Sequence, residues 1–340
     1  MSKITTIGLD LAKNVFQVHG VDANGNVLVR RQLRRSELYK FFADLAPCLV
    51  GIEACASSHH WAREIAKLGH EVRLMPAGYV KPYVKRGKTD AADAAAIAEA
   101  VTRPTMRFVA IKTAEQQSAL MLHKVRDLLV RQRTMLINAL RGHLGEFGIV
   151  GAGGAKKVPA LIEQLHAVQD GLPEVARVML HTLIDQLRTL EGQIAKIDKR
   201  IVEATRASKE GRRLMTIPGV GPIIASAIAA AVPDMMRFGS GRQFAAWLGL
   251  TPQPKSSGGK ERLGGISKQG DRYLRRLLVT GATAVIRFAR AASSPSHDWA
   301  QRLLGRKPTR VATVALANKT ARIIWAVSVK QQPYAATVAA

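Results

Sequence analysis

Strand signals are confined to the first third of this chain. Apolar segments rich in β-branched residues occur at "ITTIGLDLA", "NVFQVHGVD", "NVLVRRQL", "CLVGIEA" and "EVRLMP". A turn signal, Asn24–Gly25, precedes the third segment and predicts a meander of the first three strands. Helical segments follow at 35–45 and 58–69. Strands interleaved with helices predict an α/β domain built on one sheet.

Helical signals replace strand signals after about residue 112. Residues 113–148 read as one long basic helix, and the glycine-rich "GAGGAKK" at 151–157 predicts a hinge or linker. A spacing of 4, 3, 4, 3, 4 then relates Leu183, Leu187, Leu190, Ile194, Ile197 and Ile201. This spacing predicts either a coiled-coil seam or an ordinary amphipathic bundle helix.

Four regions are therefore expected. Residues 1–112 form the α/β domain, 113–210 a helical linker with a coiled-coil-like insertion, 211–330 a helical C-terminal domain, and 331–340 a tail.

The charge balance restricts the class of partner. The 340 residues include 51 Lys and Arg against 25 Asp and Glu, a formal charge of +26. Residues 251–340 alone hold 16 basic residues and three acids. A field of this sign favours a polyanion, most often nucleic acid. We expect no membrane span, because "IIASAIAAAV" at 223–232 is far shorter than the roughly 20 residues that a bilayer requires.

The two cysteines indicate a reducing compartment. Cys48 and Cys55 lack CxxC spacing, and Met1–Lys3 lead directly into a strand-like segment without a signal peptide. We therefore expect reduced thiols in a cytoplasmic protein. A zinc site from Cys55, His59 and His60 is disfavoured, because "CASSHH" has no second pair of ligands.

Four acids stand at the predicted ends of strands and helices in the first domain. Asp90 and Asp93 open the alanine-rich segment "KTDAADAAAIAEA" at 88–100, Asp10 ends the first strand, and Glu53 ends the strand "VGIEA". Asp90 and Asp93 could simply cap a helix, and each strand-end acid could have a polar partner. Taken together, four converging carboxylates favour two divalent cations about 4 Å apart.

Long segments of the chain resemble the IS110 family of insertion-sequence transposases. The resemblance is carried by "GLDLAKNVFQVHGVD", "GIEACASSHHWAREI" and "GKTDAADAAAIAEA", and later by "IPGVGPIIASAIAAAV" and "RQFAAWLGLTPQPKSSGGKERLGGISKQGDRYLRRLL". It implies an RNase H-like, RuvC-like N-terminal domain with a DEDD set of metal ligands. The matching positions are Asp10, Glu53, Asp90 and Asp93.

The C-terminal motifs point to phosphate. "TIPGVGPIIA" at 216–225 reads as a helix–hairpin–helix turn, in which Gly219 and Gly221 would let backbone N–H groups reach a phosphate; a plain glycine turn between packed helices is the alternative. "KSSGGK" lacks the spacing of a Walker A loop, and its residues alone favour a nucleophile only weakly. The resemblance implies a serine nucleophile here, and we favour Ser257 over Ser256. The predicted nucleic-acid contacts are Lys85, Arg86, Lys88, Gly219, Gly221, Lys255, Lys260, Arg262, Lys268, Arg272, Arg275 and Arg276.

The expected function is that of a DNA transposase or recombinase that uses Mg²⁺ or Mn²⁺ at the acidic site and a serine nucleophile. The resemblance further implies a structured guide (bridge) RNA that pairs with donor and target DNA. It also implies a homodimer or homotetramer with composite sites, in a bacterial cytoplasm and on the nucleoid. Two alternatives stay open: a nuclease of the Holliday-junction-resolvase type, and a non-enzymatic nucleic-acid scaffold.

Overall fold

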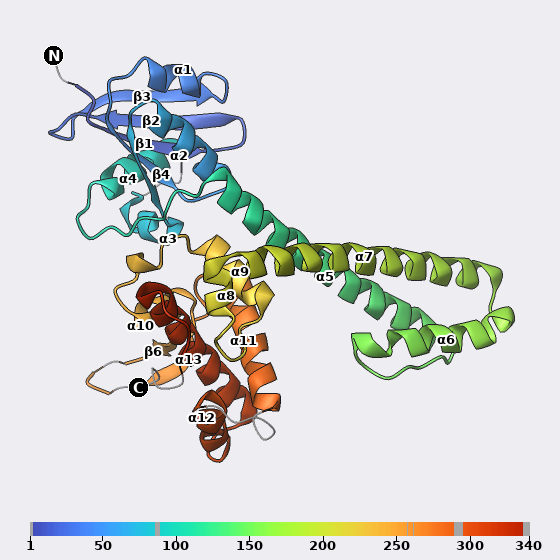
Figure 1. The fold of residues 1–340 in the computed structure, drawn as a ribbon. Helices are drawn as coiled ribbons and strands as arrows, with labels where there is room; N and C mark the ends of the chain where they lie inside the picture. The colour runs from blue at the N-terminus through green and yellow to red at the C-terminus, as the bar shows by residue number, and fades with distance from the viewer. Residues whose placement is uncertain (1–2, 86–88, 257, 261, 289–294, 336–340) are drawn as a thin grey trace. The chain divides into compact units, whose positions relative to one another are not determined.

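The computed structural model describes residues 3–85, 89–256, 258–260, 262–288 and 295–335. The chain divides into two compact units, Met1–Glu115 and Gln116–Ala340 (Figure 1). The first holds a mixed α/β sheet and the second is mostly helical, as the sequence predicts.

The N-terminal unit is built on a five-stranded sheet with the order β3-β2-β1-β4-β5. Strands β1, β2 and β3 form an antiparallel meander, and β4 and β5 extend the sheet parallel to β1. The strands are β1 (Thr6–Leu11), β2 (Val15–Val21), β3 (Val27–Arg34), β4 (Leu49–Glu53) and β5 (Glu71–Met75). The helices are α1 (Leu38–Ala43), α2 (Ser58–Lys67), α3 (Ala77–Val80), the 3₁₀ turn η1 (Lys81–Tyr83) and α4 (Asp90–Val101).

The two faces of this sheet have different coverings. Alternating apolar side chains such as Ile7 and Ile52 pack with α1 and α2 into one core. On the opposite face β1 presents Gly8 and β4 presents Gly51, which are paired across the two strands. A Cβ atom on Gly8 would lie 2.0 Å from the carbonyl oxygen of Ala94, and one on Gly51 would lie 2.8 Å from Val101. Gly8 thus allows the backbone of α4 to rest directly on the sheet, and Gly51 makes room for the Val101 side chain of the same helix.

Helix α4 is capped by Thr89. The Thr89 hydroxyl accepts a hydrogen bond from the N–H of Ala92 at 3.2 Å, and Asp90 is the first residue inside the helix. The interpretation of Asp90 as the N-cap is therefore wrong, because the N-cap is the preceding residue, Thr89. Neither Asp90 nor Asp93 is needed to begin the helix, although both gain from its positive end.

The second unit begins with a long helical hairpin. It comprises α5 (Ala114–Gly145), the short turn η2 (Ala155–Lys157), α6 (Val158–Val168), η3 (Gln169–Gly171) and α7 (Glu174–Ala207). Residues from α5, α6 and α7, including Leu140, Leu161 and Ile184, share one buried cluster. Leu187 of the predicted seam belongs to this cluster, whereas Leu183 and Ile197 are only half-buried. The part of the seam at Leu187 thus packs inside a small bundle of its own chain, and a coiled coil stays a prediction.

The C-terminal helices enclose a second core. They are α8 (Lys209–Leu214), α9 (Pro222–Ala231), η4 (Met235–Arg237), α10 (Gly241–Trp247), α11 (Arg272–Arg287), α12 (Pro295–Leu304) and α13 (Thr309–Lys330), with a two-stranded hairpin of β6 (Pro252–Pro254) and β7 (Leu263–Ile266). Buried His123 links α5 to this core, with ring nitrogens 2.9 Å from the Ser226 hydroxyl and 3.2 Å from that of Tyr273. No helix in the described part of the chain is both long and apolar enough to cross a bilayer.

Adding a single methyl group at Gly8 should test whether this glycine is required for the close packing of α4, or whether it affects only the flexibility of the backbone. Gly8→Ala should destabilise the N-terminal unit by about 2 kcal/mol or more, because its Cβ would overlap the α4 backbone. The matched control is Gly78→Ala, where a Cβ meets nothing within 4 Å; it should be neutral or stabilising. Hydrogen exchange of β1 and α4 amides under increasing denaturant measures both effects. Equal protection of these amides in the two variants would contradict a packing role for Gly8.

Candidate active site

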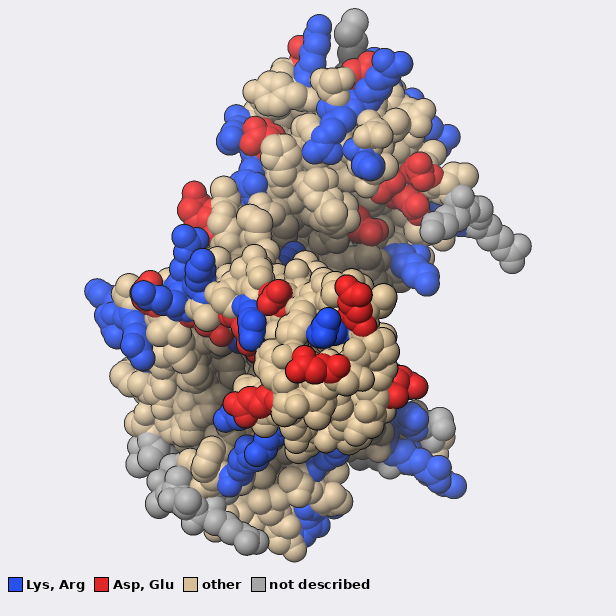
Figure 2. Space-filling view, turned by 90° about the vertical axis from the view of Figure 1, so that its right-hand side faces the viewer, with Lys and Arg blue, Asp and Glu red and all other residues tan. Residues whose placement is uncertain are grey.

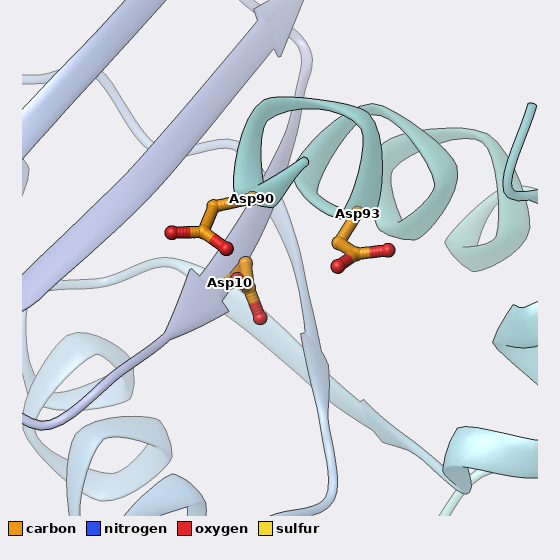
Figure 3. A group of neighbouring side chains, drawn as sticks. All are labelled: Asp10, Asp90 and Asp93. Atoms are coloured by element: carbon orange, nitrogen blue, oxygen red, sulfur yellow. The ribbon is translucent and has the colours of Figure 1, made fainter. Parts of the chain in front are cut away.

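Three carboxylates meet beneath the first turn of α4. Asp10 leaves the end of β1 while Asp90 and Asp93 descend from α4, and Figure 3 shows the three side chains around a common space. One carboxylate oxygen from each lies within 4.8 Å of the others. No described basic side chain forms a salt bridge with any of them. The site is thus a concentration of negative charge in a strongly basic chain.

Glu53, the fourth predicted acid, lies beside this trio but outside its closest grouping. The register that pairs Gly8 with Gly51 and Leu9 with Ile52 brings Asp10 and Glu53 to neighbouring strand ends. Both acids follow their glycine by two residues, so both side chains leave the sheet on the α4 face. In keeping with this neighbouring position, the charge of Glu53 contributes to the raised pKa of Asp10, and the charge of Asp93 contributes to the raised pKa of Glu53.

Burial and neighbouring negative charge raise the pKa values of two of these acids, Asp10 and Glu53. Burial, together with the negative charges of Asp93, Asp90 and Glu53, raises the pKa of Asp10 from 3.8 to about 6. Burial, and then Asp93, also raise the pKa of Glu53. A bound cation would remove this cost, since it replaces repulsion between carboxylates by attraction to a shared charge.

The donor set fits a hard divalent cation. Carboxylate oxygens are the ligands that Mg²⁺ and Mn²⁺ prefer, whereas zinc favours nitrogen and sulfur. Cys55, His59 and His60 do not form a metal-ligand cluster among the described residues, and the N–H of Lys112 donates a hydrogen bond to His59 Nδ1 at 3.2 Å. The structure therefore gives no support to the zinc alternative.

The "KSSGGK" segment forms the loop of the β6–β7 hairpin. The N–H of Lys255 donates to the Arg262 carbonyl at 2.8 Å, and the N–H of Arg262 donates to the Ser256 hydroxyl at 3.2 Å. Gly258 and Gly259 have φ angles of 57° and 75°, a conformation that glycine adopts readily. Ser257, the favoured nucleophile, lies outside the described residues. Ser256 is exposed, but its oxygen already takes part in closing the hairpin.

Comparison with known proteins decides the family. A transposase of Pseudomonas aeruginosa, described as a probable family 20 transposase, is 50% identical over 97% of this chain and 98% of its own. The transposase of IS1328 from Yersinia enterocolitica is 40% identical over 96% of this chain and 98% of its own. That of IS1111A from Coxiella burnetii is 39% identical over 98% and 92%. The chain belongs to the IS110/IS116/IS902 family of transposases.

Two family descriptions match separate parts of this transposase. One, named for the DEDD transposases of IS110, matches residues 7–149; the other, the Transposase IS116/IS110/IS902 family, matches residues 211–297. The first match covers the acid cluster, and the second covers the β6–β7 hairpin. A mixed α/β sheet followed by a helical region is compatible with a DEDD transposase fold.

Most of the predicted basic contacts lie at the surface. Lys85, Lys255, Lys260, Arg262, Lys268 and Arg272 are exposed, and Arg86 and Lys88 lie outside the described residues. Figure 2 shows Lys and Arg side chains at many places on both units.

Arg275 and Arg276 have partners within the chain. Arg275 donates to the carbonyl oxygens of Leu248 and Gln269 at 2.9 and 2.8 Å, and Arg276 pairs with Asp127. These two guanidinium groups hold α11 in place, and a phosphate contact for either stays a prediction.

Gly219 has a packing role against α11. Its φ is 82°, and an added Cβ would lie 2.9 Å from the carbonyl oxygen of Gly281 in α11. Gly221, by contrast, has open space where a Cβ would stand and precedes the first residue of α9. The close approach of α11 explains Gly219 by helix packing, and phosphate binding at either glycine stays a prediction.

Metal binding and pH should be linked through Asp10. Because the folded-state pKa of Asp10 is raised from 3.8 to about 6, the metal-free fold holds this proton more tightly than the unfolded chain does. The stability gained from that proton is present below pH 4 and is lost as the pH rises through about 6. A cation competes with the same proton, so MnCl₂ or MgCl₂ should raise the melting temperature more at pH 7.5 than at pH 5. Thermal unfolding with and without metal at both pH values measures this, with Asp10→Asn as the control variant. An equal metal effect at both pH values, or an undiminished one in Asp10→Asn, would contradict the assignment.

Proposed function

We propose that this transposase cuts and rejoins DNA strands with a divalent metal site at Asp10, Glu53, Asp90 and Asp93. The observation that carries the proposal is the convergence of three carboxylates, among which burial and then the neighbouring acids raise the pKa of Asp10. Family membership supports DNA as the substrate. When bound, Mg²⁺ or Mn²⁺ would neutralise charge on the phosphodiester under attack. The four acids hold and orient that cation.

The proposed nucleophile is the hydroxyl of Ser257. Its oxygen forms a bond to phosphorus while the bond from phosphorus to one DNA oxygen breaks; the hydroxyl proton leaves, and the released DNA oxygen takes up a proton. The strand then remains attached to the protein as a phosphoserine, which conserves the phosphodiester energy for rejoining. Exposed Lys255, Lys260 and Arg262 would offset negative charge on the phosphate. The engagement of Ser256 in the hairpin supports Ser257 as the reacting residue.

The proposed assembly includes a guide RNA and more than one copy of the chain. The net charge of +26 suits binding of nucleic acid, including a second strand beside the DNA. Helix α5 carries an exposed apolar row at Met121, Leu128 and Met135, spaced by seven residues. That spacing suits packing against a second helix, which supports a dimer or tetramer through the helical hairpin.

The acid cluster is tested by single substitutions that remove one charge. Asp10→Asn and Asp93→Asn should each reduce strand cleavage by at least about 100-fold, the scale expected when a charge-stabilising group is lost from a reacting centre. DNA binding should change little. Glu99→Gln on the same helix α4 is the matched control, because the Glu99 carboxylate pairs with Arg103 at the surface. Cleavage of labelled DNA and a gel-shift assay give the two readouts. Wild-type cleavage by either Asp variant would exclude the metal site, and binding without metal-dependent cleavage in the wild type would favour a scaffold.

The serine is tested by trapping the covalent product. Ser257→Ala should abolish the protein–DNA adduct on denaturing gels, while Ser256→Ala should retain it with a loosened hairpin. Loss of the adduct in Ser256→Ala alone would move the assignment by one residue. Cleavage by a variant with both serines replaced would indicate a resolvase-type nuclease that uses the acids without serine chemistry.

The guide RNA is tested by identifying the RNA that copurifies with the protein. We expect the purified transposase to carry a structured RNA from its own element, bound with a steep salt dependence because phosphate contacts release counterions. Nuclease treatment followed by a recombination assay, with RNA added back as the control, measures the requirement. Full recombination by RNA-free protein would contradict guidance.

A further inference from the structure

A long groove lies beside α13 in the C-terminal unit, apart from the acid cluster. It has a volume of about 1370 Å³. One exposed face of α13, from Arg310 to Lys330, lines it over about 30 Å at the usual helical rise. The other walls come from α10, from Trp299 of α12 and from the base of the β6–β7 hairpin.

The charge along this groove has one sign. Six basic residues line it: Arg242, Lys268, Arg310, Lys319, Arg322 and Lys330. No acid is among its described lining residues, and none of the six forms a salt bridge with a described acid. Burial, and then the neighbouring charges of Arg302 and Arg322, lower the pKa of Lys319. Such uncompensated positive charge suits a polyanion.

The lining is also apolar and aromatic. Trp299, Trp325 and Tyr334 line the groove together with aliphatic residues of α13 such as Val314 and Ile323. The indole N–H of Trp325 donates to the Phe238 carbonyl at 2.9 Å, and the Lys319 ammonium lies 4.9 Å from the centre of the Trp299 ring. These contacts hold both indoles in place. A duplex presents phosphates outward and hides its base faces, so an apolar lining serves unpaired bases better.

We propose that the α13 groove binds an unpaired stretch of a DNA strand, with bases against the aromatic lining and phosphates on the six cations. The proposal rests on the function proposed above. Pro252 and Gly264, at the base of the hairpin, belong to the groove wall, and the hairpin loop carries the serine. A strand held at that loop for cleavage can therefore continue into the groove. Since the strand that is cut is DNA, DNA is the occupant.

A second copy of this chain fits the groove less well. The whole chain has 25 acids against 51 basic residues, so a partner surface able to match six uncompensated cations is scarce. A nucleic-acid strand supplies one negative charge at every nucleotide and a ring face beside it. The combination of cationic and aromatic walls therefore favours the strand.

The test uses the full-length protein and a fluorescent oligothymidylate of roughly 15 nucleotides, within the range that one single-strand site covers. The groove variant is Arg242→Gln/Arg310→Gln/Arg322→Gln, in which all three side chains are exposed. The matched control, Lys196→Gln/Arg200→Gln/Arg206→Gln, removes three exposed charges from α7. The groove variant should bind at least about 30-fold more weakly, with the slope of log affinity against log salt reduced by roughly 2; the control should stay within about threefold.

Further binding and crosslinking measurements identify the chemical class of the ligand. An abasic oligomer of the same length should bind at least about 10-fold more weakly than oligothymidylate, because it cannot stack. An oligomer carrying 5-iodouracil should crosslink to Trp299, Trp325 or Tyr334, as mapped by mass spectrometry. Asp10→Asn should bind the strand normally, so a failed groove and a failed metal site give different results.

Four results of the strand-binding measurements would overturn the proposal. They are equal losses in the groove and control variants, equal affinity for the abasic strand, equal competition by duplex DNA, and at least tenfold tighter binding of matched RNA through the same residues. A change of oligomeric state in the groove variant with unchanged strand binding would instead assign the groove to a second copy, and would also overturn it.

Discussion

The direct contact of α4 with two glycines determines the N-terminal unit. Gly8 and Gly51 are paired on β1 and β4. The backbone of α4 occupies the space that a side chain at Gly8 would need, and the Val101 side chain of α4 occupies that at Gly51. Each glycine stands two residues before an acid, in "GLD" and "GIE". Residues two apart on a strand share a face, so the glycine that contacts α4 and the carboxylate that follows it lie on the same face of the sheet. The first turn of α4 lies close to the Asp10 carboxylate and contributes Asp90 and Asp93 to the acid cluster. The packing of α4 on the sheet thus brings the negatively charged side chains together.

That concentration is costly without a cation, and the surrounding chain does not relieve it through described ion pairs. Burial and three neighbouring acids raise the pKa of Asp10, while the positive end of α4 offsets only part of the repulsion. A protein of charge +26 has ample basic residues with which to neutralise four acids. Among the described residues, however, the salt bridges near this site, such as Arg103 with Glu99, involve other acids. The uncompensated cluster is therefore better explained by a ligand than by structural stability.

The sequence predicted the strands of the sheet well, and it marked the acids as candidate metal ligands, because both depend on local patterns. Alternating apolar residues identified the strands, and strand-end acids identified Asp10 and Glu53. The cap at Thr89 was missed because three polar residues stand at that helix start and only geometry distinguishes them. The partners of Arg275 are Leu248 and Gln269, and the partner of Arg276 is Asp127. All three lie outside the helix that carries the two arginines, and no local sequence pattern connects them to it. The α13 groove was missed for the same reason, since its walls join segments separated by up to about ninety residues.

The two candidate reaction centres are positioned by different physical means. The acids are fixed by a helix packed on a sheet, so their geometry exists before any substrate arrives. The hairpin loop has two glycines with positive φ and open space around them, and its described basic side chains are exposed. Little within the described part of this loop fixes it against the rest of the unit. A DNA strand that contacts Lys255 and Lys260 while lying in the α13 groove would supply the missing contacts. Under the proposed function, the DNA strand would then help to position the described part of the loop, and correct DNA binding would become a condition for cleavage.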